Sequence, residues 1–413
     1  MKLLLNDNRV DINKVMDDGS SPFYVACQNG HIEIVKLLLN DQRIDINTAG
    51  PFYNLTPFFI ACLKGHVEVV KLLLNDNRVD INKADKYDRW TPFYIACRNG
   101  HIEIVKLLLN DNRVDINKAD KYDGQTPFYI ACLKGYIEIV KLLLNDNRVD
   151  FNKENKYEET PLNIACYYGC IEIVKLLLNN QRVDVNKLEN KYGKTPFFSV
   201  CEKGQIEVVK LLLNDERVDL NKARNNGLTP FWIACWNGHI EIVKLLLNDE
   251  RVGINKTDNE YRWTPFYIVC YKKHIEIVKL LLNDQRVDIN KANIDHQTPF
   301  FLSCREGHIG VVKLLLNDVR AEINKPNSDV VTPLHIACYY GEIEIVKYIL
   351  ASGREVKLNF KTNDGKSAID FAREKGKMEI VELLESFTRN PNEIRTRHLL
   401  HGKTQLFSFI FFH

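Results

Sequence analysis

The sequence lacks an excess of either charge. Its 56 lysines and arginines are balanced by 54 aspartates and glutamates, which leaves a net charge of +2 at pH 7. Proteins that bind nucleic acids or anionic membranes through general electrostatics need a positive excess, because phosphate contacts supply much of that affinity. The balance argues against both classes, and we expect no nucleic-acid partner.

Long hydrophobic runs are also missing. No stretch approaches the roughly 20 apolar residues that cross a bilayer, so no membrane span is expected. The N-terminal stretch MKLLLNDNRV turns polar after three leucines, which does not fit a secretory signal peptide. We therefore expect a cytoplasmic protein in a reducing compartment, where its 11 cysteines need an explanation other than disulfides.

Sequence signatures of enzymes are absent. The chain has no G-x-x-x-x-G-K phosphate loop and no G-x-G-x-x-G dinucleotide motif. Its histidines and most of its cysteines recur with a repeat, so a catalytic triad built from them would have to occur many times over. Cys166 and Cys170 lie four residues apart, but two cysteines alone do not form a zinc site, which needs four ligands. We expect no enzyme activity, no cofactor and no metal.

The chain contains instead a repeat of 34 or 35 residues. Each copy opens with Thr-Pro, or once with Ser-Pro, and an eleventh copy opens at Ser367 with SAIDFAREKG. The marking prolines are Pro22, Pro57, Pro92, Pro127, Pro161, Pro196, Pro230, Pro265, Pro299 and Pro333.

The copy TPFYIACRNGHIEIVKLLLNDNRVDINKADKYDGQ, residues 91–125, predicts two short helices. Thr91 can cap the first helix, Pro92 suits its first turn, and Asn99 with Gly100 can end it. HIEIVKLLLN predicts a second helix with a single polar stripe. RVDIN alternates apolar and polar residues like a short extended segment, and KADKYDGQ predicts a polar turn.

One such copy cannot bury its own apolar faces, whereas stacked copies can. The predicted fold is therefore an all-α repeat solenoid of stacked helix–turn–helix units with hairpin-like finger loops. TPFYIACRNGHIEIVKLLL followed by VDIN resembles the ankyrin repeat, whose unit carries T-P-L-H-x-A, and the resemblance covers about residues 1–385. It implies a concave face built from first helices and fingers, and an activity that consists of binding another protein.

The copies depart from the ankyrin pattern at two places. An extra residue lies in LLLNDNRVDIN, where the family tends to place a glycine after the second helix. We expect Asn77, Asn112 and Asn147 to supply the left-handed backbone angle instead. Only TPLHIAC keeps the family's histidine, His335, so a Thr–His hydrogen bond shared along the stack is not expected in most copies.

The repeat pattern also sets the expected boundaries. Residues 1–13 match the second half of a repeat, so we expect a partial repeat at 1–15 and either a truncated sequence or a longer parent protein. The array is expected at 16–385. The tail, 386–413, has no repeat match and is expected to be disordered.

The recurring cysteines and histidines have structural interpretations. Ten cysteines occupy one position of the first helix, where a small buried thiol can pack like alanine. Six histidines open second helices, where we expect them to cap or pack the turn between helices. They are His31, His66, His101, His239, His274 and His308.

The positions before Thr-Pro and after Ala-Cys vary strongly among the copies. They hold residues as different as Glu, Leu, Arg and Trp. Burying an unpaired charge is costly, so such positions must face solvent or a partner. In ankyrin proteins, the resemblance implies, these positions line the recognition surface.

Three of the four tryptophans fall within residues 229–263. Trp232 and Trp236 are four residues apart and share one face of a first helix. Trp263 opens the next hairpin, directly before the copy in which Tyr267 and Tyr271 repeat the same spacing. We expect these five residues to form one patch that anchors a partner, since Trp and Tyr are favoured at binding hot spots.

A second, smaller site is predicted at Trp90, Tyr94 and Arg98. The alternative for all these rings is that they lie flat on neighbouring copies and fill gaps. That alternative is strongest for Trp232, which occupies the position of the family's histidine.

Two functions remain open. The first is a non-enzymatic scaffold that acts as a monomer and holds a partner protein of unknown identity on the concave face. The second is a structural spacer or tether, a fragment of a larger protein whose effector domain is absent.

Overall fold

The computed structural model describes residues 10–51, 53–189 and 192–391. They divide into two compact units, an N-terminal unit that ends at Asp219 and a C-terminal unit that begins at Leu220. Each unit consists of consecutive helix pairs. This confirms the all-α repeat solenoid.

The first helices of the N-terminal unit are α2 (Pro22–Gln28), α4 (Pro57–Lys64), α6 (Pro92–Asn99), α8 (Pro127–Lys134), α10 (Pro161–Tyr167) and α12 (Pro196–Lys203). Its second helices are α3 (Ile32–Leu39), α5 (Val67–Leu74), α7 (Ile102–Leu109), α9 (Ile137–Leu144), α11 (Ile171–Leu178) and α13 (Ile206–Leu213).

The first helices of the C-terminal unit are α14 (Pro230–Asn237), α16 (Pro265–Tyr271), α18 (Pro299–Arg305), α20 (Pro333–Tyr340) and α22 (Ala368–Glu374). Its second helices are α15 (Ile240–Leu247), α17 (Ile275–Asn283), α19 (Ile309–Asn317), α21 (Ile343–Ala351) and α23 (Met378–Arg389).

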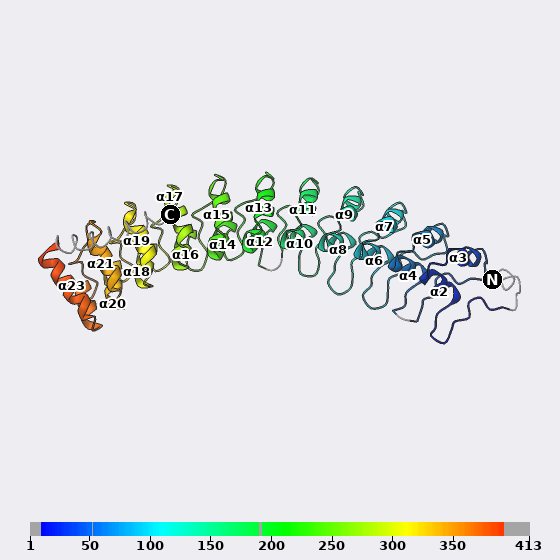
Figure 1. Ribbon diagram of the computed structural model, residues 1–413, viewed down its shortest axis with the longest axis horizontal. Helices are drawn as coiled ribbons and strands as arrows, with labels where there is room; N and C mark the ends of the chain where they lie inside the picture. Colours follow the sequence, from blue (N-terminus) through cyan, green and yellow to red (C-terminus); the bar gives the residue numbers. More distant parts are fainter. Residues whose placement is uncertain (1–9, 52, 190–191, 392–413) are drawn as a thin grey trace, which may run out of the picture. The chain divides into compact units, whose positions relative to one another are not determined.

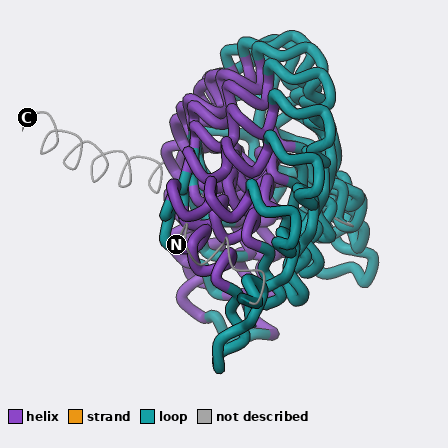
Figure 2. Tube along the Cα trace, turned by 90° about the vertical axis from the view of Figure 1, so that its right-hand side faces the viewer, coloured by secondary structure: helices purple, strands orange, loops and turns teal. Residues whose placement is uncertain are grey.

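Within each unit the first helices stack in one row and the second helices in another, and the finger loops project on the side of the first helices (Figure 1). Seen along the stack, helices lie on one side and loops on the other (Figure 2). The fingers of the described residues contain no regular strand, only one isolated bridge between Glu189 and Lys194. Backbone hydrogen bonds join neighbouring fingers, such as Lys121 N to Asp88 O at 2.8 Å.

The helix ends follow the predicted caps. Thr91 Oγ1 accepts a hydrogen bond from Tyr94 N at 3.1 Å, and Pro92 occupies the first turn of α6. Gly100 ends that helix with φ of 77°, a backbone angle that glycine adopts without steric cost. The same Thr-Pro start recurs from α4 to α20, so one local signal fixes each repeat.

The core consists of the apolar positions of both helices. In α6 and α7, Phe93, Cys97, Val105 and Leu108 are at most 1% exposed. The ten periodic cysteines are all buried free thiols, and burial raises the pKa of the Cys97 thiol well above its usual range. This confirms that they pack as small core residues.

Turns replace the extended segment that RVDIN predicted. Arg113 to Asn117 form two successive turns, and the apolar–polar alternation reflects the burial of Val114 and Ile116. The prediction was wrong because side chains compete for the backbone: Arg113 N donates to the Asp111 carboxylate at 2.9 Å, which favours a turn.

The left-handed asparagines are also a wrong prediction. Asn77, Asn112 and Asn147 have no positive φ. Most second helices end in right-handed geometry, as at Asn110, whereas α17 and α19 end in extended geometry at Asp284 and Asp318. An arginine of the next repeat can then satisfy a free carbonyl. Arg148 Nη2 donates to Leu109 O at 2.6 Å.

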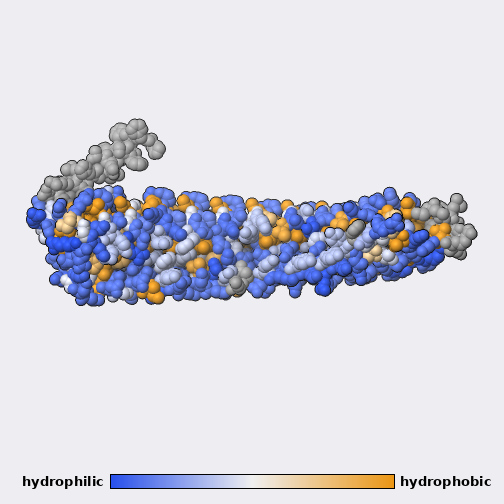
Figure 3. Space-filling model, turned by 90° about the horizontal axis from the view of Figure 1, so that it is seen from below, coloured by the Kyte–Doolittle hydropathy of each residue, from blue (hydrophilic) through white to orange (hydrophobic). Residues whose placement is uncertain are grey.

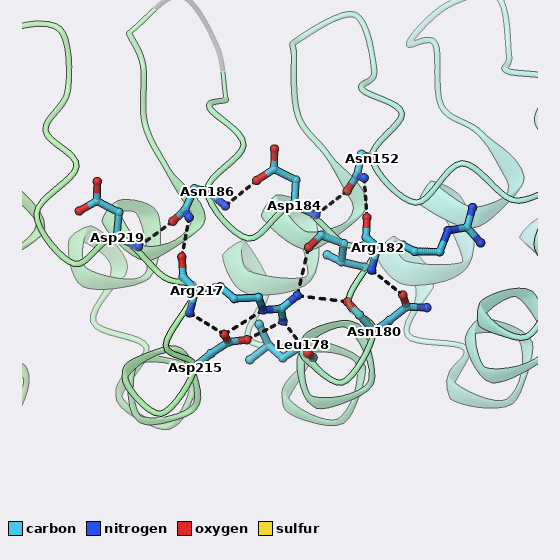
Figure 4. A network of polar contacts seen from close by, with 10 residues as sticks. Asn152, Leu178, Asn180, Arg182, Asp184, Asn186, Asp215, Arg217 and Asp219 are labelled. Carbon is cyan, nitrogen blue, oxygen red and sulfur yellow. Dashed lines mark hydrogen bonds and ion pairs between the residues drawn. The ribbon is translucent and has the colours of Figure 1, made fainter.

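An asparagine ladder connects successive repeats (Figure 4). Asn186 Nδ2 donates to Arg217 O at 2.6 Å, and Asn186 Oδ1 accepts from Asp219 N at 2.8 Å. Asn152 bonds the next repeat in the same way. Arg217 also contacts the Asp215 carboxylate through two nitrogens and reaches Leu178 O at 2.6 Å. The extra residue in the LLLNDNRVDIN segment of each repeat therefore lies in a segment whose polar groups hydrogen-bond to the neighbouring repeat.

The C-terminal helix α23 continues to Arg389, because Phe387 is buried at 5% exposure. Residues 386–389, which the sequence assigned to the tail, are thus helical. The rest of the predicted tail from residue 392, and residues 1–9 of the partial repeat, lie outside the described residues. Among the described helices none is long and apolar enough to cross a membrane.

Candidate partner-binding site

A carboxylate at the base of one finger positions Trp263. Asp258 is 6% exposed and accepts backbone hydrogen bonds from Glu260, Tyr261 and Trp263, the last at 2.6 Å. These bonds fold the finger tip back toward α16. The backbone of Trp263 is therefore held in one position by its own finger.

Trp232 links this finger to α14. It is 4% exposed, and its Nε1 donates to Trp263 O at 3.0 Å. Its ring stacks on Trp236, with centroids 5.2 Å apart and planes 18° from parallel. Trp236 is half-buried. Trp232 thus packs against the ring of Trp236 and, through its hydrogen bond to Trp263 O, connects two neighbouring repeats.

Trp263 is surrounded by tyrosines. Its ring centroid lies 5.5 Å from Tyr267, 5.5 Å from Tyr271 and 5.0 Å from Tyr261. Tyr267 is buried at 1% exposure, whereas Tyr271 and Tyr261 are exposed. The structure therefore brings the five predicted aromatic residues together and adds Tyr261, which sequence reasoning missed. Its signal was the tyrosine that recurs in the finger tips.

We call the six residues Trp232, Trp236, Tyr261, Trp263, Tyr267 and Tyr271 the aromatic cluster. A cation completes it, since Lys272 Nζ lies 3.9 Å from the centroid of Trp236. The same pairing occurs between Lys203 and Tyr167 at 4.7 Å, and between Lys375 and Tyr339 at 4.4 Å. The sequence carries this signal as an aromatic residue followed 36 positions later by lysine.

The predicted second site also comes together. Trp90 stacks on Tyr94 with centroids 5.9 Å apart, and Arg98 Cζ lies 4.5 Å above Trp90. Tyr94 is 2% exposed, and burial raises the pKa of its hydroxyl well above the usual range. Asp85 shapes this finger as Asp258 does the other, because it accepts from Trp90 N at 2.6 Å.

Tyr94, Trp232 and Tyr267 occupy the same position of their repeats and are all buried. His335 holds that position in α20, where its Nδ1 lies 2.6 Å from Thr332 Oγ1. The gap-filling alternative therefore describes this position well. The other predicted site residues keep exposed surface: Trp236, Trp263, Tyr271, Trp90 and Arg98.

The histidines act between repeats. The Nε2 atoms of His66, His101 and His274 lie 2.9–3.1 Å from backbone carbonyls at the end of the preceding first helix. They thereby satisfy carbonyls that a helix end leaves free. The three residues thus cap the first helix of the preceding repeat, and their side chains form no cap on the helices that they open.

Models of ankyrin repeats match nearly the whole chain, in overlapping segments at residues 1–85, 45–120, 77–155, 112–188, 181–258, 250–327 and 319–394. The chain belongs to the ankyrin repeat family. Ankyrin repeats are generally protein–protein interaction modules, and the family is typically non-catalytic. No curated protein matches the chain at a significant level.

The finger side of the ankyrin array is largely hydrophilic, with small, separate hydrophobic areas (Figure 3). Within the described residues no three metal-ligating side chains cluster. Polar side chains flank the aromatic cluster, among them the exposed Lys272, and large rings with polar neighbours are common in recognition sites.

Proposed function

We propose that the protein is a non-enzymatic scaffold that binds a partner protein on the concave face of its ankyrin array. The partner contacts the first helices and finger loops of the C-terminal unit, with Trp236, Trp263 and Tyr271 as anchors. Trp90 and Arg98 provide a secondary contact in the N-terminal unit.

The observation that carries this proposal is the position of the exposed rings. Trp236 and Tyr271 follow the buried core of α14 and α16, at positions that vary among the repeats. Buried neighbours hold each ring, as Trp232 holds Trp236 at 5.2 Å. Large, preorganised aromatic side chains offer contact area at low entropic cost, which is typical of binding hot spots.

We also propose that the protein acts as a monomer in the cytoplasm. Its 11 cysteines are free thiols, which fits a reducing compartment. The finger side shows only small hydrophobic areas rather than one continuous patch (Figure 3). Light scattering after size-exclusion chromatography and cell fractionation test these two statements.

The test compares wild type with Trp236→Ala/Trp263→Ala/Tyr271→Ala in capture experiments from native lysate. A matched control, Tyr87→Ala/Tyr122→Ala, removes exposed rings from finger tips of the N-terminal unit. Circular dichroism first establishes that all chains are equally helical, and Tyr271→Ala alone serves if the triple variant is not.

A protein held by wild type and control but lost from the triple variant supports the proposal. If the triple variant captures the same proteins as wild type, or wild type captures none, the proposal fails. The rings are then structural, as in a spacer or tether.

A further inference from the structure

We propose that the aromatic cluster binds an acidic segment of the partner protein, whose carboxylates are received by Lys272, Lys273 and Arg262. This rests on the proposed function and adds to it the chemistry of the partner. Three observations carry it: a strained lysine, an excess of exposed cations, and ring faces that are already covered.

Lys273 occupies a position that glycine holds in every other described repeat. Its φ is 59°, in the left-handed region. The corresponding residues are Gly30, Gly65, Gly100, Gly135, Gly169, Gly204, Gly238, Gly307, Gly341 and Gly376, all with positive φ. A side chain is disfavoured at this angle, and residues held in such conformations cluster at functional sites. The exception falls two residues after Tyr271, a member of the aromatic cluster.

The histidine hydrogen bond that joins a repeat to the preceding one differs in the repeat that follows Lys273. At Gly238, an added Cβ would lie 3.0 Å from His274 Cε1, so a side chain there crowds the following histidine. His308, the corresponding histidine of the repeat after Lys273, uses Nδ1 to contact Cys270 O at 3.0 Å, whereas His274 uses Nε2 to contact Trp236 O. The carbonyl that His308 contacts lies one position earlier in its helix than the one His274 contacts. The packing around Lys273 is thus arranged for a residue with a side chain.

Helix electrostatics explains only one of the two lysines. A lysine at the C-terminal end of a first helix complements the helix dipole, and other repeats place one at the position of Lys272, as Lys64 and Lys134 do. The favourable interaction with the helix dipole is already provided by a lysine at the position of Lys272, and it does not require a second lysine at the left-handed position of Lys273. Lys273 therefore adds a second charge where the backbone disfavours it.

The cluster carries more available cations than anions. Lys272, Lys273 and Arg262 are exposed and form no ion pair within the described part of the chain. The neighbouring acid Glu306 is already engaged, because it pairs with Arg305 at 2.7 Å. Glu260 lies close enough to the Tyr261 hydroxyl to raise the pKa of that hydroxyl. Asp258 holds the finger backbone, and Asp295 lies on the next finger. A partner carboxylate therefore complements this surface.

Covered ring faces favour a protein segment over a nucleic acid. Trp236 lies between Trp232 and the Lys272 ammonium group, and Trp263 stacks with Tyr261 and Tyr267. Single-stranded nucleic acids bind proteins by stacking bases on free ring faces. Tyr261 and Tyr271 remain exposed beside these rings, and they suit apolar side chains flanked by carboxylates.

The test uses the full chain with Trp90→Phe, so that all remaining tryptophans belong to the cluster and report on it by fluorescence. The probes are short peptides with leucine at every third position and Glu, Gln or Lys elsewhere, together with oligothymidylate. We expect the Glu peptide to bind about tenfold more tightly than the Gln peptide, and this preference to fall with added salt.

The charge variant Lys272→Gln/Lys273→Gln should remove the preference for the Glu peptide. Its matched control is Lys64→Gln/Lys134→Gln, which removes equivalent lysines from α4 and α8 and should leave the preference unchanged. Equal binding of the Glu and Gln peptides, an unchanged preference in the charge variant, or tighter binding of oligothymidylate overturns the proposal.

Failure of the two proposals is distinguishable. If the triple aromatic variant still captures the partner while the Glu peptide binds in a lysine-dependent manner, the scaffold proposal fails and the acidic site remains. If capture depends on the rings but the peptides show no charge preference, the acidic partner is wrong and the scaffold remains.

Discussion

Replacing Lys273 with glycine should stabilise the C-terminal unit. Left-handed backbone costs a residue with a side chain about 1–2 kcal/mol, and Lys273 adopts it with φ of 59°. The greater freedom of glycine in the unfolded chain offsets about 0.5–1 kcal/mol of that gain. The expected net increase in the free energy of unfolding is about 0.5–1 kcal/mol, or about 1–4 °C in the melting midpoint.

Urea unfolding followed by tryptophan fluorescence measures this change near its source, since three of the four tryptophans belong to the aromatic cluster. Lys273→Gln is the matched control: it removes the charge but keeps the strained side chain, so its midpoint should stay near wild type. An unfolding midpoint of Lys273→Gly at or below that of wild type would refute the strain argument.

The reciprocal change, Gly238→Lys, tests the same reasoning from the other side. It places a side chain at φ of 76°, with its Cβ 3.0 Å from His274 Cε1. We expect a loss of about 1–2 kcal/mol in the free energy of unfolding, measured in the same urea titration. Equal stability of Gly238→Lys and wild type would show that this turn tolerates any residue.

Three further predictions concern the array. Asn186→Ala removes two hydrogen bonds between repeats and should lower the free energy of unfolding by about 1–3 kcal/mol. Urea titration measures this loss, and an unchanged unfolding midpoint would mean that the asparagine ladder does not stabilise the array. The hydrogen bond from Arg217 lowers the pKa of Asp215. The stability from this pair is therefore present above the ordinary carboxyl pKa of about 4 and is lost as pH falls through the lowered value. Asp215→Asn should reduce the acid sensitivity of unfolding, and an unaltered dependence of unfolding on pH would contradict this. In native protein at neutral pH, a thiol reagent should modify the half-exposed Cys170 first and the ten buried cysteines only on unfolding; simultaneous modification of all thiols by mass spectrometry would contradict their burial.

Local signals made the repeat predictable from sequence. Thr91 and Gly100 fix a helix start and a helix end through their own backbone neighbours, so their roles do not depend on the rest of the chain. The burial of the periodic cysteines followed from their uniformity among the repeats. The five clustered aromatic residues were predictable because helical spacing and the repeat period together determine which side chains lie near each other.

Contacts between repeats were not predictable in the same way. Asn186 finds its partners more than 30 positions later, and its sequence context does not reveal them. The same joint removed the need for a left-handed residue after each second helix, which is why the prediction for Asn77 failed. Lys273 could have been noticed from sequence, since it is the repeat's lone departure from glycine among the described turns, but the cost of that departure required the backbone angle.

The most direct test of partner binding through the cluster is the affinity of the captured partner for purified protein, measured by fluorescence titration. We predict that Trp236→Ala/Trp263→Ala/Tyr271→Ala weakens binding at least about 30-fold, the loss expected for hot-spot residues, while Tyr87→Ala/Tyr122→Ala leaves it within about threefold. A triple variant that binds as tightly as wild type, or a control that loses as much affinity as the triple variant, would contradict the central claim.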